Sequence, residues 1–271
     1  MISEFMMNAA AGGVLGLLIG SFLNVVIHRL PLMMEQEWNA EGAQWAEDQK
    51  EKGAKIELPP AQPAMTLSKP RSRCPHCGHQ VAWYENIPVL SYLFLRGRCS
   101  ECKKPISLRY PVVELVCAAL FAFCLGRDGL TPTGFAWCGF SAALLALALI
   151  DWDTTFLPDS ITLPLLWAGL IASALQWTSV PLLSSVWGAV AGYMSLWLIF
   201  WACKLTTGKE GMGYGDFKLC AALGAWFGWQ ALVPIILMAS VVGAVIGIAL
   251  KINSKLREGG YVPFGPFLAG G

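Results

Sequence analysis

Two aspartates stand where long apolar segments meet short polar loops, and they are the first candidates for chemistry in this chain. Asp151 directly follows the apolar run 141–150, and Asp216 closes the tetrapeptide 213–216 just before an apolar run that starts at Leu219. An ionisable side chain at membrane depth is costly, so it points to function and needs a partner. We expect each aspartate to be the partner of the other, because aspartic proteases use a pair of carboxyl groups as their catalytic residues.

Two further aspartates, Asp153 and Asp159, share the short loop 151–160 with Asp151. Both fit the ordinary roles of solvent-exposed or helix-capping residues. Asp159 suits the N-cap of the apolar segment that begins at Ile161. Asp151 lies closest to the apolar run and is therefore the candidate. In the other loop, three glycines at alternate positions precede Asp216 and let the backbone approach its surroundings closely. The sequence thus predicts Asp151 and Asp216 as the catalytic pair.

Cysteines give the second chemical signal, as two CxxC pairs separated by 21 residues. This spacing is typical of a tetrahedral four-thiolate zinc site, whose four protein ligands leave no open position and make the metal structural. A segment this short cannot bury a core, so the metal would supply its folding energy. Paired disulfides, redox dithiols, or ligation by His76 or His79 are the alternatives, although we expect both histidines beside the metal or in solvent. The predicted zinc ligands are Cys74, Cys77, Cys99 and Cys102.

The composition indicates an integral membrane protein. Of the 271 residues, 55% are hydrophobic and only 14% are charged, and the mean hydropathy is +0.53. A soluble domain carries about 25% charged residues. The net charge of +1 argues against nucleic acid as a partner and leaves the lipid bilayer as the expected surroundings.

The apolar segments predict the number of spans, since a spanning helix needs about 20 apolar residues. The long segment 219–250 would form about 48 Å of helix, too much for a hydrocarbon core about 30 Å thick, so we divide it near 230–234. A further apolar segment opens at Val262 and stops at Gly271. The predicted fold is therefore an all-α polytopic membrane protein with seven spans and a truncated eighth. The remaining predicted spans are 8–27, 112–125, 134–150, 161–177 and 185–203.

Basic residues predict the orientation. With seven crossings, the twelve Lys and Arg residues in 29–110, the three in 204–218 and the three after Leu250 fall on one side, and only Arg127 falls on the other. The positive-inside rule makes the side with eighteen basic residues cytoplasmic. Asp151 and Asp216 then both emerge on the cytoplasmic side at similar depth.

Three parts follow from this layout. Residues 1–28 hold the first span, residues 29–110 form a cytoplasmic insertion that contains the zinc module 74–102, and residues 111–271 form the multi-span domain with the aspartates. Within the insertion, residues 31–60 read as a helix on the membrane surface with Met34, Trp38 and Trp45 on one face, followed by the linker 59–70. No internal repeat is evident in the sequence.

Together these features resemble the bacterial type IV prepilin peptidases, the GxGD-type aspartic proteases that process prepilins and the pseudopilins of type II secretion. Four stretches carry the resemblance: GSFLNVVIHRLP at 20–31, the two CxxC pairs, Asp151 with LPD at 157–159, and GKEGMGYGDFK at 208–218. The resemblance implies that Asp151 and Asp216 are catalytic and that the four cysteines bind zinc. It also implies a second activity, N-methylation of the new N-terminus with S-adenosylmethionine, for which no site residue can be named. The implied location is the bacterial inner membrane, with the active site on the cytoplasmic side.

We therefore expect an intramembrane endopeptidase that removes the basic leader from prepilins or pseudopilins. One carboxylate would take a proton from water while the other, protonated, polarises the scissile carbonyl. Two other classes remain open. One is a transporter with a proton-relay aspartate pair, although such sites usually lie at the membrane midplane. The other is a non-enzymatic scaffold whose zinc module binds a partner, which leaves both aspartates unexplained.

Overall fold

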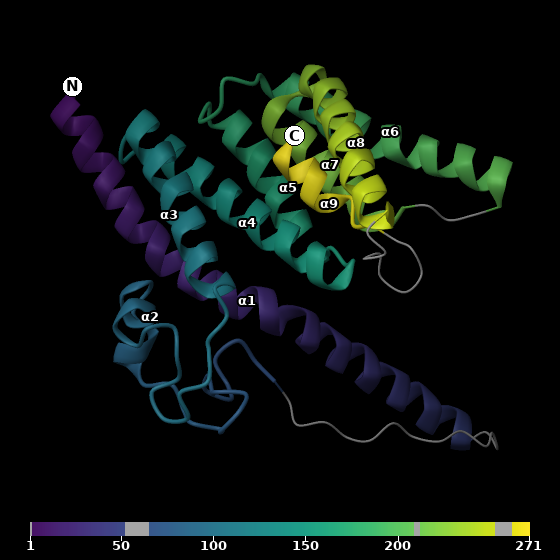
Figure 1. Ribbon diagram of the computed structural model, residues 1–271. Coiled ribbons are helices and arrows are strands. Elements are labelled where there is room, and N and C mark those ends of the chain that lie inside the picture. Colours follow the sequence, from purple (N-terminus) through teal and green to yellow (C-terminus); the bar gives the residue numbers. More distant parts are fainter. Residues whose placement is uncertain (1, 52–64, 209–211, 253–261) are drawn as a thin grey trace. The chain divides into compact units, whose positions relative to one another are not determined.

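The computed structural model describes residues 2–51, 65–208, 212–252 and 262–271, and within these ranges its regular elements are helices and two isolated β-bridges (Figure 1). Among the described residues, five helices are long and apolar enough to cross a membrane: α1, α3, α4, α6 and α8, while α5 is a shorter apolar helix. The all-α membrane class is thus confirmed, whereas the count of seven spans and a truncated eighth stays a prediction. The helices are α1 (Ile2–Glu51), α2 (Leu90–Phe94), α3 (Arg109–Asp128), α4 (Pro132–Thr154), α5 (Asp159–Ala174), α6 (Leu182–Thr207), α7 (Tyr214–Phe227), α8 (Trp229–Ile252) and α9 (Gly265–Gly270), with a 3₁₀ turn η1 (Trp83–Asn86) before α2.

The long apolar segment 219–250 is divided between two helices, as its length requires. The break falls at Gly228, two residues before the predicted region, where the backbone has a φ of 81° that suits glycine. Pro234, which the sequence offered as part of the break, instead lies inside α8.

The chain divides into two compact units. Residues 17–116 form the first unit, and residues 1–16 together with 117–271 form the second. The first unit holds the cysteine module and the second holds both aspartates. These divisions differ from the predicted boundaries at 28/29 and 110/111, which stay a prediction. Helix α1 is continuous through Pro31 to Glu51, and residues 52–60 of the predicted surface helix lie outside the described residues.

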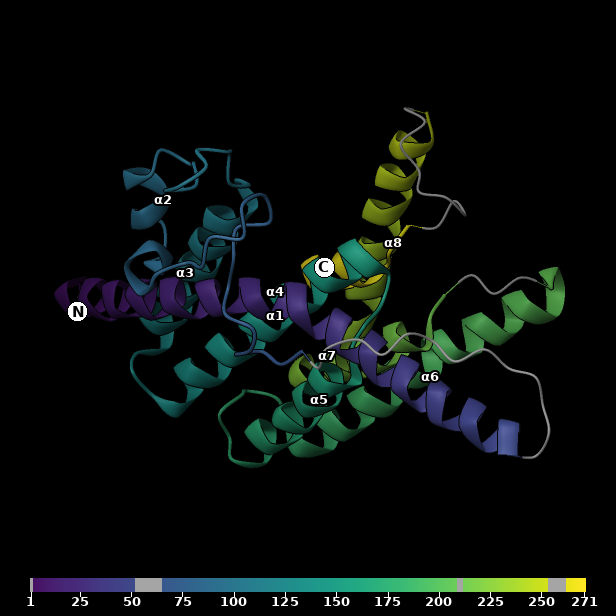
Figure 2. The same ribbon diagram turned by 90° about the horizontal axis from the view of Figure 1, so that it is seen from below.

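Helix α7 forms the centre of the second unit. It packs against α5, α6, α8 and α9 (Figures 1 and 2), and ten of its fourteen residues are buried. The approach to α6 is close because Gly188 and Gly224 face each other, and a Cβ on either would overlap the backbone of the other. At the far end of α7, the buried Trp226 Nε1 donates a hydrogen bond to the Leu165 carbonyl at 2.8 Å. These contacts fix the position of α7 and hence of the aspartate in its first turn.

Candidate active site and metal centre

Asp151 lies in the last turn of α4 and not, as the sequence suggested, at the start of a loop. The helix continues to Thr154 and ends at Thr155, which adopts a left-handed conformation (φ 57°) and donates its N–H to the Asp151 carbonyl at 2.8 Å. The connection to α5 is therefore only residues 155–158. The Asp151 side chain is 4% exposed.

Asp216 lies in the first turn of α7, three residues after the N-cap Gly213. Its N–H donates to the Gly213 carbonyl at 3.2 Å, and its side chain is 7% exposed. Carboxylate oxygen Oδ1 is buried and makes no hydrogen bond with any part of the chain that the structure describes. A buried carboxyl oxygen without a partner is costly, so this atom is poised to bind a ligand or to carry a proton.

The structure brings the two carboxyl groups near enough to interact electrostatically. Leu157, in the short connection between α4 and α5, lies close to both Gly215 and Gly265. A Cβ on Gly215, the residue before Asp216, would lie 2.7 Å from Leu157 Cβ, and a Cβ on Gly265 would lie 2.6 Å from Asp151 Oδ2. Glycine at these two positions is therefore what allows the backbones of α7 and α9 to reach the site.

Asp153 and Asp159 lie apart from this pair. Asp153 is exposed near the end of α4. Asp159 is the first residue of α5 and makes no capping hydrogen bond, so its predicted role as an N-cap is wrong. Its carboxylate instead pairs with Lys218 of α7, with Lys218 Nζ 2.6 Å from Asp159 Oδ2. This ion pair joins the start of α5 to the α7 turn that carries Asp216.

Gly265 is a site residue that the sequence did not indicate. Its backbone N–H donates to Asp151 Oδ2 at 2.9 Å in a buried position, across 114 residues of sequence. The signal that could have found it is the pair of prolines in the segment Pro263-Phe264-Gly265-Pro266, because prolines around a glycine mark irregular backbone inside an apolar run.

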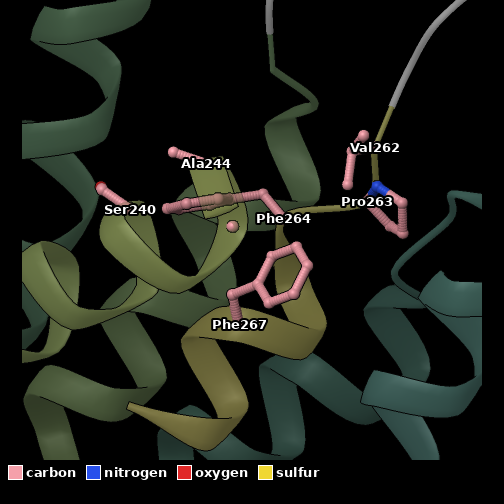
Figure 3. Close-up of a pocket in the computed structure, with 7 residues that line it drawn as sticks. Ser240, Ala244, Val262, Pro263, Phe264 and Phe267 are labelled. Carbon is pink, nitrogen blue, oxygen red and sulfur yellow. The ribbon is translucent and has the colours of Figure 1, made fainter. Parts of the chain in front are cut away.

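A small hollow of about 230 Å³ lies beside the same segment, between α8 and residues 262–267 (Figure 3). Its lining is apolar apart from one serine hydroxyl. Phe264 and Phe267, on either side of the glycine that bonds Asp151, form part of its wall. The residues that line it are Ser240, Gly243, Ala244, Val262, Pro263, Phe264 and Phe267.

The four predicted zinc ligands come together in the other unit. Their sulfur atoms all lie within 4.8 Å of one another, with Cys74 Sγ 3.8 Å from Cys102 Sγ and Cys77 Sγ 3.9 Å from Cys99 Sγ. A tetrahedron with Zn–S bonds of about 2.3 Å has edges of about 3.8 Å. A disulfide requires about 2.05 Å. The donor set and its spacing therefore fit one tetrahedrally bound zinc ion and not a pair of disulfides.

The two CxxC segments have the same backbone fold, offset by 25 residues. We call them the first knuckle (72–81) and the second knuckle (97–106). In each, the first cysteine donates its N–H to a carbonyl five residues later, and a residue with positive φ (Gly78 or Lys103) follows the second cysteine. Backbone N–H groups of His76 and Cys77 point at Cys74 Sγ and lower the pKa of that thiol, and those of Cys102 and Glu101 lower the pKa of Cys99, which favours the thiolate at the first cysteine of each knuckle. Despite the backbone N–H of His79, burial and the neighbouring sulfurs raise the pKa of Cys77 to about 12. The structure thus contains a short repeat, which the sequence carries as Arg-x-Arg-Cys-x-x-Cys at 71–77 and 96–102, so the expectation of no internal repeat is wrong.

His79 connects the two knuckles rather than competing for the metal. Its Nε2 lies 3.1 Å from Glu85 Oε2 and 3.2 Å from Ser100 Oγ, and its Nδ1 lies 2.8 Å from Glu101 Oε2. The hydrogen bond and charge of Glu85 raise the pKa of His79. His76 is exposed. Both histidines therefore lie where the sequence placed them, outside the four-cysteine set.

Comparison with known proteins gives a consistent result over almost the whole chain. Residues 14–127 match the Bacterial Peptidase A24 N-terminal domain, and residues 138–248 match the Type IV leader peptidase family. Proteins named prepilin leader peptidase/N-methyltransferase share about half of their aligned residues with this chain. The one from Stutzerimonas stutzeri is 50% identical over 94% of this chain and 86% of its own length. The one from Burkholderia pseudomallei (strain K96243) is 50% identical over 98% and 84%, and the one from Pseudomonas aeruginosa is 49% identical over 94% and 85%. No solved structure matches the chain.

Proposed function

The chain belongs to the type IV leader peptidase family, and from that premise we propose that Asp151 and Asp216 catalyse the cleavage of prepilin leader peptides. The protein is a prepilin leader peptidase and N-methyltransferase by its relationship to the family. The observation that supports the assignment of residues is that two buried carboxyl groups, one from the end of α4 and one from the start of α7, lie near enough to interact electrostatically. A transporter or a scaffold is not favoured, because neither class accounts for the family relationship.

Peptide hydrolysis by this pair needs one carboxylate and one carboxylic acid. The carboxylate accepts a proton from water as the water oxygen bonds to the scissile carbonyl carbon, and the acid donates its proton to the carbonyl oxygen. The first carboxyl group, now protonated, then gives its proton to the amide nitrogen as the C–N bond breaks. Addition of water makes the scissile carbon a gem-diol. When the C–N bond breaks, this carbon becomes the new C-terminal carboxyl group, and one of the diol hydroxyl protons passes to the second aspartate, which is then protonated again. Two close carboxyl groups with one proton between them are suited to this exchange.

Zinc, bound by Cys74, Cys77, Cys99 and Cys102, has a structural role in this proposal. All four ligands come from the protein, so the ion would tie the two knuckles together and take no part in hydrolysis. S-adenosylmethionine is the proposed methyl donor, and its support is the N-methyltransferase name of the relatives.

The proposed orientation places both aspartates and the zinc module on the cytoplasmic side of the bacterial inner membrane. The support is the distribution of basic residues, eighteen of which fall on one side when the chain crosses the membrane seven times as predicted. Cytoplasmic reporters placed near Asp153 and Lys255 should be active, and a periplasmic reporter near Arg127 should be active. A periplasmic signal from the connection between α4 and α5 would contradict the orientation.

Purified enzyme incubated with a prepilin, with and without S-adenosylmethionine, tests the function itself. We expect loss of the leader in both reactions and a gain of one methyl group only when the donor is present. The proposed substrates are prepilins or pseudopilins. Intact substrate after prolonged incubation would contradict the proposal.

A further inference from the structure

The segment that contains Gly265 is held from several directions. Phe267 and Leu268 are buried, and α9 packs along α4, α7 and α8. On α8, a Cβ at Gly243 would already come within 3.0 Å of the Phe267 ring. The backbone at the start of α9 therefore has little freedom to move.

This fixed backbone points a hydrogen-bond donor at the site. The Gly265 N–H reaches Asp151 Oδ2 at 2.9 Å, and the bond is buried. A hydrogen bond to a charged oxygen is stronger than one between neutral groups, and in a buried site water does not compete for it. The donor belongs to the main chain, so any residue except proline can supply it.

A side chain at this position would nevertheless displace the Asp151 carboxylate. A Cβ on Gly265 would lie 2.6 Å from Asp151 Oδ2, 3.2 Å from Asp151 Cγ and 3.3 Å from Leu157 Cδ1. A side chain would therefore push the Asp151 carboxylate away from the amide that holds it. The chain needs both the amide and the absence of a side chain at the same point.

We propose that Gly265 is a positioning residue for leader cleavage, whose backbone N–H fixes the Asp151 carboxylate in the orientation that hydrolysis requires. The proposal rests on the assignment of Asp151 as a catalytic residue. It adds a third element, α9, to an active site that otherwise consists of the ends of α4 and α7. A catalytic group displaced by about 1 Å can lose about 100-fold in rate.

The test compares Gly265→Ala with two other glycine-to-alanine variants in the full-length enzyme. Gly270→Ala adds a methyl group in the same helix where nothing lies within 4 Å. Gly243→Ala presses on Phe267 from α8 without touching Asp151. We expect Gly265→Ala to lower kcat for prepilin cleavage by about 100-fold with KM changed by less than about twofold, because the substrate-binding surface stays intact. Both control variants should keep kcat within about threefold of wild type.

Two results would overturn the inference. One is wild-type kcat in Gly265→Ala, and the other is an equal loss of kcat in Gly243→Ala, which would assign the effect to packing of α9. If the wild-type enzyme itself fails to cleave prepilin, the proposed function has failed and not this inference.

A second measurement works even if Gly265→Ala does not fold. In Asp151→Ala the Gly265 N–H loses its acceptor, so hydrogen exchange in a peptide covering residues 264–268 should accelerate by at least about tenfold. Peptides from α6 should exchange as in the wild type. Unchanged exchange at 264–268 would show that the hydrogen bond does not hold this segment to Asp151.

Discussion

Removing one sulfur ligand should unfold the zinc module while leaving the membrane helices intact. Among residues 65–110 only Gly97 and Cys99 are buried, so the module has no apolar core to sustain it. In the proposed zinc site the metal supplies the folding free energy of the module, as in other small zinc modules. We expect Cys99→Ser to reduce bound zinc from about one per chain to less than about 0.1.

Loss of the metal should release the backbone hydrogen bonds of both knuckles together. Each knuckle contains three: those donated by Cys74, Gly78 and Val81 in the first, and by Cys99, Lys103 and Ile106 in the second. We expect these six amides to exchange at least about 100-fold faster in Cys99→Ser, because they exchange through opening of a module that no longer folds. Peptides from α4 and α7 should exchange as in the wild type.

Metal analysis and hydrogen exchange by mass spectrometry are the assays, and Cys203→Ser is the matched control. Cys203 is an exposed thiol on α6, outside the four-cysteine cluster, so its replacement should change neither zinc content nor exchange. Treatment of the wild type with a strong chelator should reproduce the Cys99→Ser pattern. Full protection of both knuckles in metal-free protein would refute the reasoning.

Three further predictions concern one residue near the aspartates and two contacts that hold α7 in place. Asp153→Asn should keep leader cleavage within about threefold of wild type, because Asp153 is exposed and outside the pair; a loss as large as that of an aspartate-pair variant in the same cleavage assay would contradict this. Lys218→Met should lower the free energy of unfolding, measured by thermal unfolding in detergent, by less than about 1 kcal/mol, because its partner Asp159 is largely exposed. A larger loss of stability would mean that the ion pair is screened from water. Trp226→Phe should lower the free energy of unfolding by about 1–3 kcal/mol in the same assay, because the Leu165 carbonyl loses its buried side-chain donor. An unchanged midpoint of thermal unfolding would show that this hydrogen bond contributes little.

The sequence predicted those features that depend on local pattern or on hydrophobicity. The spacing of the cysteines predicted their convergence, and the length of segment 219–250 predicted its division into two helices. In both cases the relevant physics, metal geometry or membrane thickness, can be stated without knowing the rest of the fold. The pairing of Asp151 with Asp216 as a catalytic unit, which their equivalent places at the ends of apolar runs suggested, stays a prediction.

Features set by packing between distant elements were missed. Asp151 was placed in a loop because the polar residues after it hide the true helix end, which depends on the left-handed conformation of Thr155. Asp159 was given a capping role because the sequence does not show that Lys218 comes within reach. Gly265 was missed because the prolines around it indicate irregular backbone but not its contact with a carboxylate 114 residues away.

The central claim is that Asp151 and Asp216 work as one unit, and leader cleavage by single and double asparagine variants tests it most directly. We expect Asp151→Asn and Asp216→Asn each to abolish the mass shift that marks leader removal, with the protein folded and zinc-loaded. The double variant should be no worse than either single one, because a pair that shares one proton fails when either member is lost. Full cleavage of prepilin by the Asp216→Asn enzyme would contradict the account.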